Sequence, residues 1–191
     1  MLKKILRYCG FLLLASGAGC ALVSTPERVQ TRLYDLEMIK AAPVSRLSVD
    51  FGSFRNLAGA GTPMLVREKN GVLLQDDANR YLMLPELLVK RRLLDLFPAA
   101  VTDDAILVHG VICRFEIDRA EGKARFAVDY ESLYGHKRVV FRHTFEEALA
   151  ENSGPAAAAA MENCVIASAR RLAGELARLK AASAAKEERR K

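Results

Sequence analysis

Apolar and polar residues alternate along five stretches of the sequence, which predicts strands that each bury one side. The stretches are residues 33–38, 46–54, 103–118, 123–132 and 137–145. The residues expected to face a core are Leu47, Val49 and Phe51, then Phe126, Val128 and Tyr130, then Val139, Phe141, His143 and Phe145. In the longest stretch, one phase holds Leu107, His109, Val111, Cys113, Phe115 and Ile117. Because the opposite phases are mostly polar, one face of the sheet is expected to be solvated.

Two shorter apolar runs, residues 63–68 and 72–75, flank the sequence Lys69-Asn70-Gly71. Asn and Gly both accept a positive φ angle, so this dipeptide predicts a tight hairpin between two further strands.

Helical spacing of apolar residues predicts two helices, at 82–97 and 155–180. Pro85 suits the first turn of the former, and Pro98 ends it. The main apolar stripe of this helix is Leu84, Leu87, Leu88, Leu94 and Phe97, whereas Leu82, Met83, Val89 and Leu93 lie off it. These four surplus residues indicate either a partner or oligomer surface, or merely the rim of the core. The second helix is Ala-rich, with a stripe of Met161, Val165, Ser168, Leu172, Leu176 and Leu179.

The predicted fold class is therefore α+β, a single antiparallel-rich sheet of about five to seven strands with both helices packed on one face. One domain is expected over residues 32–180, followed by a charged, disordered tail at 181–191.

The first 20 residues have the pattern of a bacterial lipoprotein signal. A basic cluster is followed by an apolar run and by small residues directly before Cys20. We expect residues 1–19 to be removed, Cys20 to be lipidated, and 20–31 to form a polar tether. Ala21, rather than Asp, follows the cysteine, which favours the outer membrane with the domain facing the periplasm. The alternative is an uncleaved anchor over residues 8–24, at the short end of a membrane span.

Charge does not favour a nucleic-acid partner, although the whole chain has a net charge of +6. Three of its 29 basic residues lie in the leader, so the mature chain has 26 against 23 acidic residues, a net charge of +3.

The cysteines leave one redox question open. Cys9 is lost with the leader and Cys20 would be lipidated, so Cys113 and Cys164 remain in an oxidising compartment. They either form a disulfide or stay free, depending on the register of strand and helix.

No pattern of catalytic or ligand-binding residues is present. The three histidines match no known catalytic or metal motif, and His109 and His143 share phase with apolar residues, which is typical of hydrogen-bonded interior histidines. Gly59 and Gly61 lack the Lys and helix of a phosphate loop. We therefore expect a protein that is not an enzyme and needs neither a metal nor a cofactor.

The order of elements resembles the ABC-type transport auxiliary lipoprotein family, the group that contains PqiC and YmbA. The features that carry the resemblance are the lipobox, the strand Tyr34-Asp35-Leu36, the Pro-led hairpin, Asn79-Arg80-Tyr81 before a Leu-rich helix with Pro85, the three-strand meander and the Ala-rich last helix. The family usually has Arg-Trp where this chain has Arg80-Tyr81.

The resemblance implies a periplasm-facing outer-membrane lipoprotein that works beside an MCE-type transport protein and its ABC transporter in lipid traffic. Two alternatives remain open. One is an LptE-like assembly lipoprotein that partners an outer-membrane barrel, and the other is a small periplasmic lipid-binding protein.

Overall fold

Seven strands and two helices make up the part of the chain, residues 30–188, that the computed structural model describes. The strands are β1 (Arg32–Tyr34), β2 (Val49–Asn56), β3 (Pro63–Arg67), β4 (Leu73–Tyr81), β5 (Ile106–Asp118), β6 (Lys123–Tyr134) and β7 (Lys137–Ala148). The helices are α2 (Pro85–Leu96) and α3 (Gly154–Glu188). Residues from Thr31 onward form one compact unit.

The strands form one mixed sheet in the order β1-β4-β3-β5-β6-β7, with β2 also paired to β5. The β3–β4, β5–β6 and β6–β7 pairs are antiparallel, whereas β1–β4, β2–β5 and β3–β5 are parallel. The prediction of α+β is confirmed, but the prediction of an antiparallel-rich sheet was wrong. Parallel pairing arises because α2 and the segment after it carry the chain back, so that β5 runs in the same direction as β2 and β3.

β2 and β3 share one edge of β5. β2 pairs with Ile106–Ile112 of β5 and β3 pairs with Ile117 and Asp118. β2 and β3 therefore lie one after the other along the same edge of β5. The loop between them, where Gly59 has a φ of +71°, separates them into two strands.

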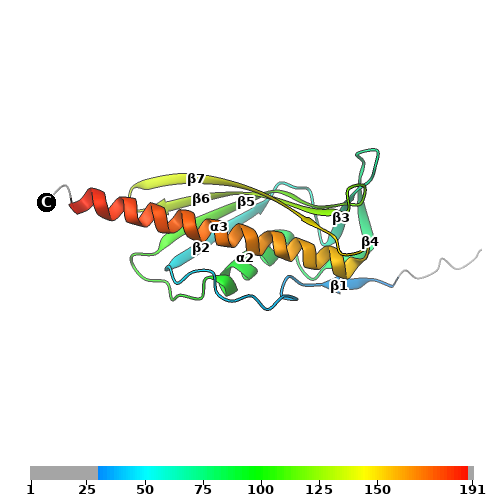
Figure 1. Cartoon of the computed structure of the whole chain (residues 1–191), viewed down its shortest axis with the longest axis horizontal. Helices are drawn as coiled ribbons and strands as arrows, with labels where there is room; N and C mark the ends of the chain where they lie inside the picture. The colour runs from blue at the N-terminus through cyan, green and yellow to red at the C-terminus, as the bar shows by residue number, and fades with distance from the viewer. Residues whose placement is uncertain (1–29, 189–191) are drawn as a thin grey trace, which may run out of the picture. The chain divides into compact units, whose positions relative to one another are not determined.

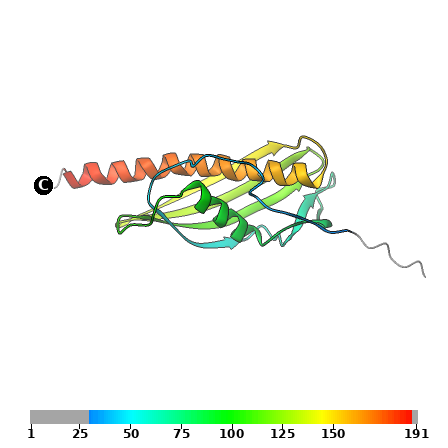
Figure 2. The same ribbon diagram turned by 90° about the horizontal axis from the view of Figure 1, so that it is seen from below.

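Both helices cover the same face of the sheet, as predicted (Figure 1 and Figure 2). α2 packs over β2, where the rings of Phe97 and Phe51 are 5.4 Å apart, and α3 crosses β6 and β7. The core between helices and sheet includes Val128 and Tyr130 of β6, both fully buried. The opposite face, here named the outer face, has no helix among the described residues.

A β-bulge at Cys113 reverses the phase of β5. Ile112 pairs with Val128, but the next paired residue, Arg114, lies opposite Ala127, so Cys113 is the extra residue. Before the bulge Ile106, Val108 and Ile112 face the core, and after it Phe115 and Ile117 do. The predicted phase was therefore wrong for Leu107, His109, Val111 and Cys113, and correct for Phe115 and Ile117.

The helices are close to the predicted ranges. α2 begins at Pro85 after Leu84 as its N-cap. All six residues of the predicted α3 stripe are buried. α3 continues to Glu188, so most of the segment expected to be a disordered tail extends this helix. No helix within residues 30–188 combines the length and the apolar character that crossing a bilayer requires.

Candidate functional site

The solvent side of α2 carries exposed leucines. Leu84, Leu87 and Leu94 are 42%, 51% and 47% exposed. Because a helix turns by about 100° per residue, these three positions fall on one side, away from the buried residues. We refer to Leu84, Leu87 and Leu94 as the leucine row. A soluble helix normally places polar residues there, so the row is a candidate surface for a partner.

Sequence reasoning assigned the core to the wrong side of this helix. Of the four residues predicted for a partner surface, Leu82 is 50% exposed, but Met83 is half-buried against the core, and Val89 and Leu93 are fully buried. The helix therefore has more apolar residues than its buried face uses, as predicted. The exposed ones are those of the leucine row and not Val89 and Leu93.

A buried ion pair fixes α2 against α3. The guanidinium of Arg92 in α2 lies 2.7 Å from the carboxylate of Glu162 in α3. Glu162 also accepts hydrogen bonds from the backbone N–H groups of Met38 and Ile39, at 2.9 and 3.0 Å, and Arg92 donates to the Ile39 carbonyl. Burial raises the pKa of the Glu162 carboxyl, and the Ile39 and Met38 N–H groups and Arg92 oppose that shift. This cluster ties the segment after β1 to both helices.

The same segment is tied to the leucine row. Arg91 lies between Leu87 and Leu94 on the helix surface and pairs with Asp35 and Glu37. The segment directly after β1 thus runs beside the exposed face of α2.

A hydrogen-bonded chain lies between β6, β7 and α3. His143 is fully buried, with Nδ1 3.0 Å from Ser168 Oγ and Nε2 2.7 Å from Glu175 Oε2. The Tyr130 hydroxyl lies 3.1 Å from the same Ser168 oxygen. An ionised carboxylate can only accept, so Nε2 donates to Glu175, Nδ1 accepts from Ser168, and Ser168 accepts from Tyr130. Burial lowers the pKa of His143, with Glu175 acting in the opposite direction.

This chain joins Ser, His and Glu, yet it does not form a reactive site. Ser168, His143 and Tyr130 are all 0% exposed, so no substrate can reach the serine oxygen. The prediction of an interior histidine is confirmed for His143. It was wrong for His109, which lies on the outer face and contacts Ser53 through Nδ1.

Both described cysteines are free, and the pairing that the predicted strand phase allowed is not formed. The bulge turns Cys113 to the outer face, where it is exposed, whereas Cys164 is buried in α3 on the helix side. Burial raises the pKa of the Cys164 thiol to about 12. Cys20, the predicted lipidation site, lies outside the described residues.

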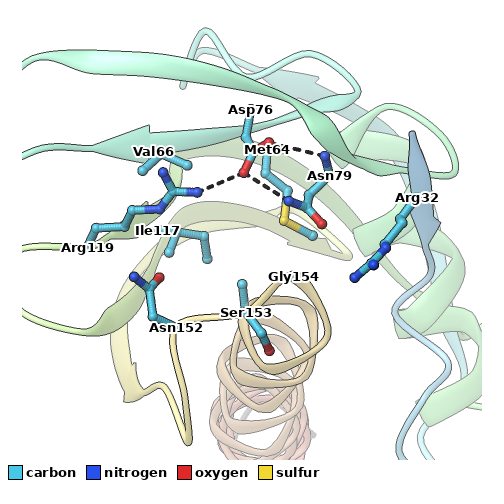
Figure 3. A pocket seen from close by; sticks show the side chains of 11 residues that line it. Arg32, Met64, Val66, Asp76, Asn79, Ile117, Arg119, Asn152, Ser153 and Gly154 are labelled. Atoms are coloured by element: carbon cyan, nitrogen blue, oxygen red, sulfur yellow. Dashed lines mark hydrogen bonds and ion pairs between the residues drawn. The ribbon is translucent and has the colours of Figure 1, made fainter. Parts of the chain in front are cut away.

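A pocket of 290 Å³ lies beside the first turn of α3 (Figure 3). Met64, Val66 and Ile117 form its apolar side, and Asp76 bonds both Arg119, at 2.8 Å, and Asn79, at 3.0 Å. Because the pocket charges are largely paired within the chain, the pocket is weaker than the leucine row as a candidate site. Nowhere in residues 30–188 do three or more His, Cys, Asp or Glu side chains come together as a metal-ligand set.

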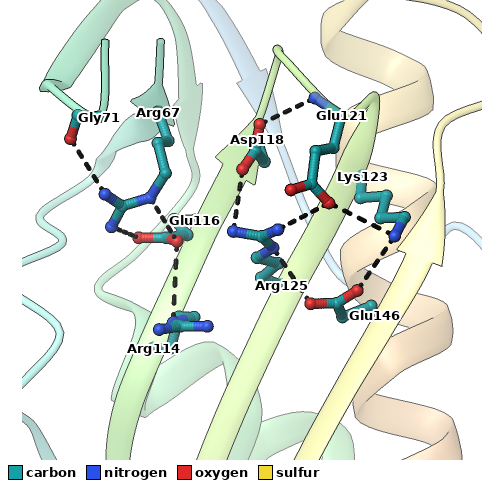
Figure 4. A network of polar contacts seen from close by, with 9 residues as sticks. All are labelled: Arg67, Gly71, Arg114, Glu116, Asp118, Glu121, Lys123, Arg125 and Glu146. Atoms are coloured by element: carbon teal, nitrogen blue, oxygen red, sulfur yellow. Dashed lines mark hydrogen bonds and ion pairs between the residues drawn. The ribbon is translucent and has the colours of Figure 1, made fainter. Parts of the chain in front are cut away.

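The outer face carries a network of ion pairs (Figure 4). Arg67 binds Glu116 through two bonds of 2.9 Å, although Glu116 is only 4% exposed. Arg125 bridges Asp118, Glu121 and Glu146 at 2.9, 2.8 and 3.1 Å. The prediction of a polar second face is confirmed, and its charges are bound to one another across β3, β5, β6 and β7.

Two solved structures share this arrangement of strands and helices. A Xanthomonas campestris protein described as DUF330 superposes with a TM-score of 0.59 at 15% identity, over 75% of this chain and 93% of its own. The domain has a DUF330-like fold. A second match, an uncharacterized protein, has a TM-score of 0.63 at 10% identity, over 77% of this chain and 99% of its own. At these identities the likeness concerns the fold alone, and it agrees with the order of elements on which the resemblance rests. No family model and no curated protein matches the sequence.

Proposed function

We propose that this chain is a lipoprotein of the outer membrane, anchored through Cys20, and that its periplasmic domain is a non-enzymatic docking component of an MCE-type ABC transport system for lipids. The observation that carries the proposal is the leucine row on a DUF330-like fold. The lipobox before Cys20 supports the anchor.

The tether and the leucine row act together in this proposal. A lipid anchor restricts the domain to the membrane surface, which raises its effective concentration toward any partner that reaches that surface. The leucine row then offers an apolar helix face of the kind that packs into a groove of another protein. The lipoprotein would in this way couple an inner-membrane transporter to the outer membrane while leaving ATP hydrolysis to the transporter.

Crosslinking in cells, with mass spectrometry of the captured partner, tests the docking. Leu87→Glu and Leu94→Glu should remove capture of the transport components, because a charge buried at an interface without a partner is costly. Leu57→Glu, on the 69% exposed Leu57 of the β2–β3 loop, is the matched control and should retain capture.

Three results would contradict the proposal. Capture by the wild type of an outer-membrane barrel in place of transport components would favour the LptE-like alternative. Copurification of lipid without any protein partner would favour a lipid-binding protein. Equal capture by all variants would show that the leucine row is not the docking surface.

The anchor is tested separately. Cys20→Ala should leave the chain unprocessed or release it from the outer-membrane fraction. Unchanged processing and fractionation would overturn the lipoprotein assignment.

A further inference from the structure

β7 is a long edge strand with opposite charges at its two ends. It begins with Lys137 and Arg138 and ends with Glu146 and Glu147 before Ala148. On one side it pairs with β6 over its whole length without a register shift. Its other edge pairs with no strand of the described residues. β7 contains no Pro and no bulge, two of the features that protect such an edge from pairing with another chain, and its charged side chains lie at its two ends and at Arg142.

The backbone groups available at this edge follow from the β6–β7 turn. Gly135, with a φ of +57°, and His136 form a two-residue turn closed by the pair Tyr134 and Lys137. The pair that closes such a turn exchanges both backbone hydrogen bonds, and such pairs recur at every second residue. The odd-numbered residues of β7 therefore bond to β6, and the even-numbered residues direct their N–H and C=O groups toward the open edge.

We propose that the open edge of β7 pairs antiparallel with β7 of a second copy of this chain, with Arg142 opposite Arg142 on the two-fold axis. Residues 137 to 147 then lie opposite residues 147 to 137. Lys137 faces Glu147 of the second copy on the helix side. On the outer side Arg138, which binds Glu131 of its own chain, faces Glu146, which binds Arg125 and Lys123 of its own chain, so the helix-side pair carries most of the charge match. The even-numbered residues form the hydrogen-bonded pairs, as the open backbone groups require. The interface is isologous and closes as a dimer.

Neighbouring registers lose this charge match. A shift of two residues in one direction places Lys137 opposite Phe145, and a shift in the other direction places Val139 opposite Glu147. A shift of one residue places side chains of the helix side opposite those of the outer side. Parallel pairing brings like charges together. The register centred on Arg142 is the one among these that pairs opposite charges on both faces.

The remaining pairs suit an interface. Val139 and Phe145, both half-buried in the single chain, lie opposite each other on the helix side. On the outer side Val140, 56% exposed in the single chain, faces Thr144. The two Arg142 side chains do not meet as free charges, because each is bound to Asp129 of its own chain at 2.9 and 3.0 Å.

Disulfide trapping of the full chain in cells tests the register. A hydrogen-bonded antiparallel pair has Cα atoms about 5.5 Å apart, within the range of a disulfide. Arg142→Cys should therefore give a reducible dimer. Cys113→Ser is included as background, because Cys113 lies on the same outer face. Val140→Cys in that background is the control. In the proposed register the two copies of position 140 would lie about 13 Å apart, which is too far for a disulfide.

Charge exchange tests the pairing independently. Within its own chain, Lys137 donates a hydrogen bond to the hydroxyl of Ser183, and Glu147 accepts one from the amide of Asn163. Because Ser183 and Asn163 are uncharged, neither bond neutralises the charge of Lys137 or Glu147. Lys137→Glu or Glu147→Lys alone creates two like-charge pairs per dimer and should lower the trapped dimer about tenfold. The double variant exchanges the charges and should restore the dimer. Lys69→Glu, at the tip of the β3–β4 hairpin, should leave it unchanged.

Absence of a dimer in the Arg142→Cys variant would overturn the proposal, and so would an equal yield from the Val140→Cys variant or failure of the double charge variant to recover. Because the measurement needs no transporter and no lipidation, it can fail while the proposed function holds, and it can succeed if that function is wrong.

Discussion

The guanidinium of Arg92 lies 2.7 Å from the carboxylate of Glu162, and both side chains are buried where α2 meets α3. Removing one partner of a buried pair leaves a charge without compensation and typically costs about 3–5 kcal/mol. We expect Arg92→Leu to lower the free energy of unfolding by about this amount in urea titration. Arg171→Leu, at a 53% exposed side chain, is expected to cost less than about 1 kcal/mol.

The pair can also be replaced in a way that retains the backbone contacts of Glu162. In Arg92→Leu/Glu162→Gln, the amide oxygen still accepts from Met38 and Ile39 while no charge remains buried. This double variant should be more stable than Arg92→Leu alone. A double variant that is as unstable as the sum of both single variants would show that the two residues act independently.

Gly154 is required by the close approach of α3 to the β1–β4 edge. A Cβ atom there would lie 2.5 Å from the Tyr34 hydroxyl and would also clash with the Asn79 amide oxygen, which accepts from Tyr34. Gly154→Ala should therefore destabilise the domain by about 1–3 kcal/mol. Gly174→Ala, in the same helix with no atom within 4 Å of the added methyl, should stabilise it by about 0.5–1 kcal/mol. Equal melting temperatures for the two variants would contradict this packing.

Stability should fall as the pH is lowered through the titration of His143. Burial lowers the pKa of the folded imidazole below its ordinary value of 6.5, so the unfolded chain binds the proton more readily. The folded state is thus fully favoured above pH 6.5, and stability is lost as the pH falls from 6.5 toward the lowered pKa. Unfolding free energies measured between pH 7.5 and about 5.5 should show this slope. His143→Gln should reduce the slope, whereas His136→Gln, in the exposed β6–β7 turn, should not.

The two described thiols should differ strongly in reactivity. Cys113 is exposed at the bulge, while Cys164 is 2% exposed and burial raises the pKa of its thiol to about 12. In a Cys9→Ser/Cys20→Ser background, a maleimide should modify one thiol rapidly under native conditions and the second only on unfolding. Modification of neither, with recovery of both after reduction, would indicate a disulfide instead.

The error at α2 shows what the sequence pattern could and could not decide. Pro85, Leu88, Val89, Leu93 and Leu96 follow regular helical spacing, and Arg92 occupies the remaining core position. Counting Arg92 as polar broke the pattern and moved the stripe toward Leu87 and Leu94. The buried position of Arg92 depends on Glu162, a residue 70 positions away, so local periodicity could not supply it. An arginine within an otherwise regular apolar spacing, together with a Glu directly beside the apolar stripe of another helix, is the signal that would have found it.

β5 shows a second limit. Alternation correctly predicted where β5 ends, although the strand begins at Ile106 and not at residue 103. It also predicted the phases of β6 and β7, because these two strands pair without interruption. The bulge at Cys113 changes the phase within one strand, and neither Gly nor Pro stands at the shift between Ile112 and Arg114, although Gly110 lies three residues before Cys113. The direction of the strands could not be predicted either. Alternation shows which side of a strand is buried, but it does not show whether neighbouring strands run parallel or antiparallel.

The bond between Glu162 and the backbone of Met38 and Ile39 also sets the order in which the domain can be completed. The β5–β6–β7 meander joins neighbours in sequence and can form early, whereas this bond spans 124 residues. A chain that enters the periplasm with its N-terminal end first would present residues 35–40 to processing and sorting factors well before α3 arrives to hold them. On the proposed function, the helix exported last would complete folding at the first segment, and residues 35–40 would stay open to those factors until then.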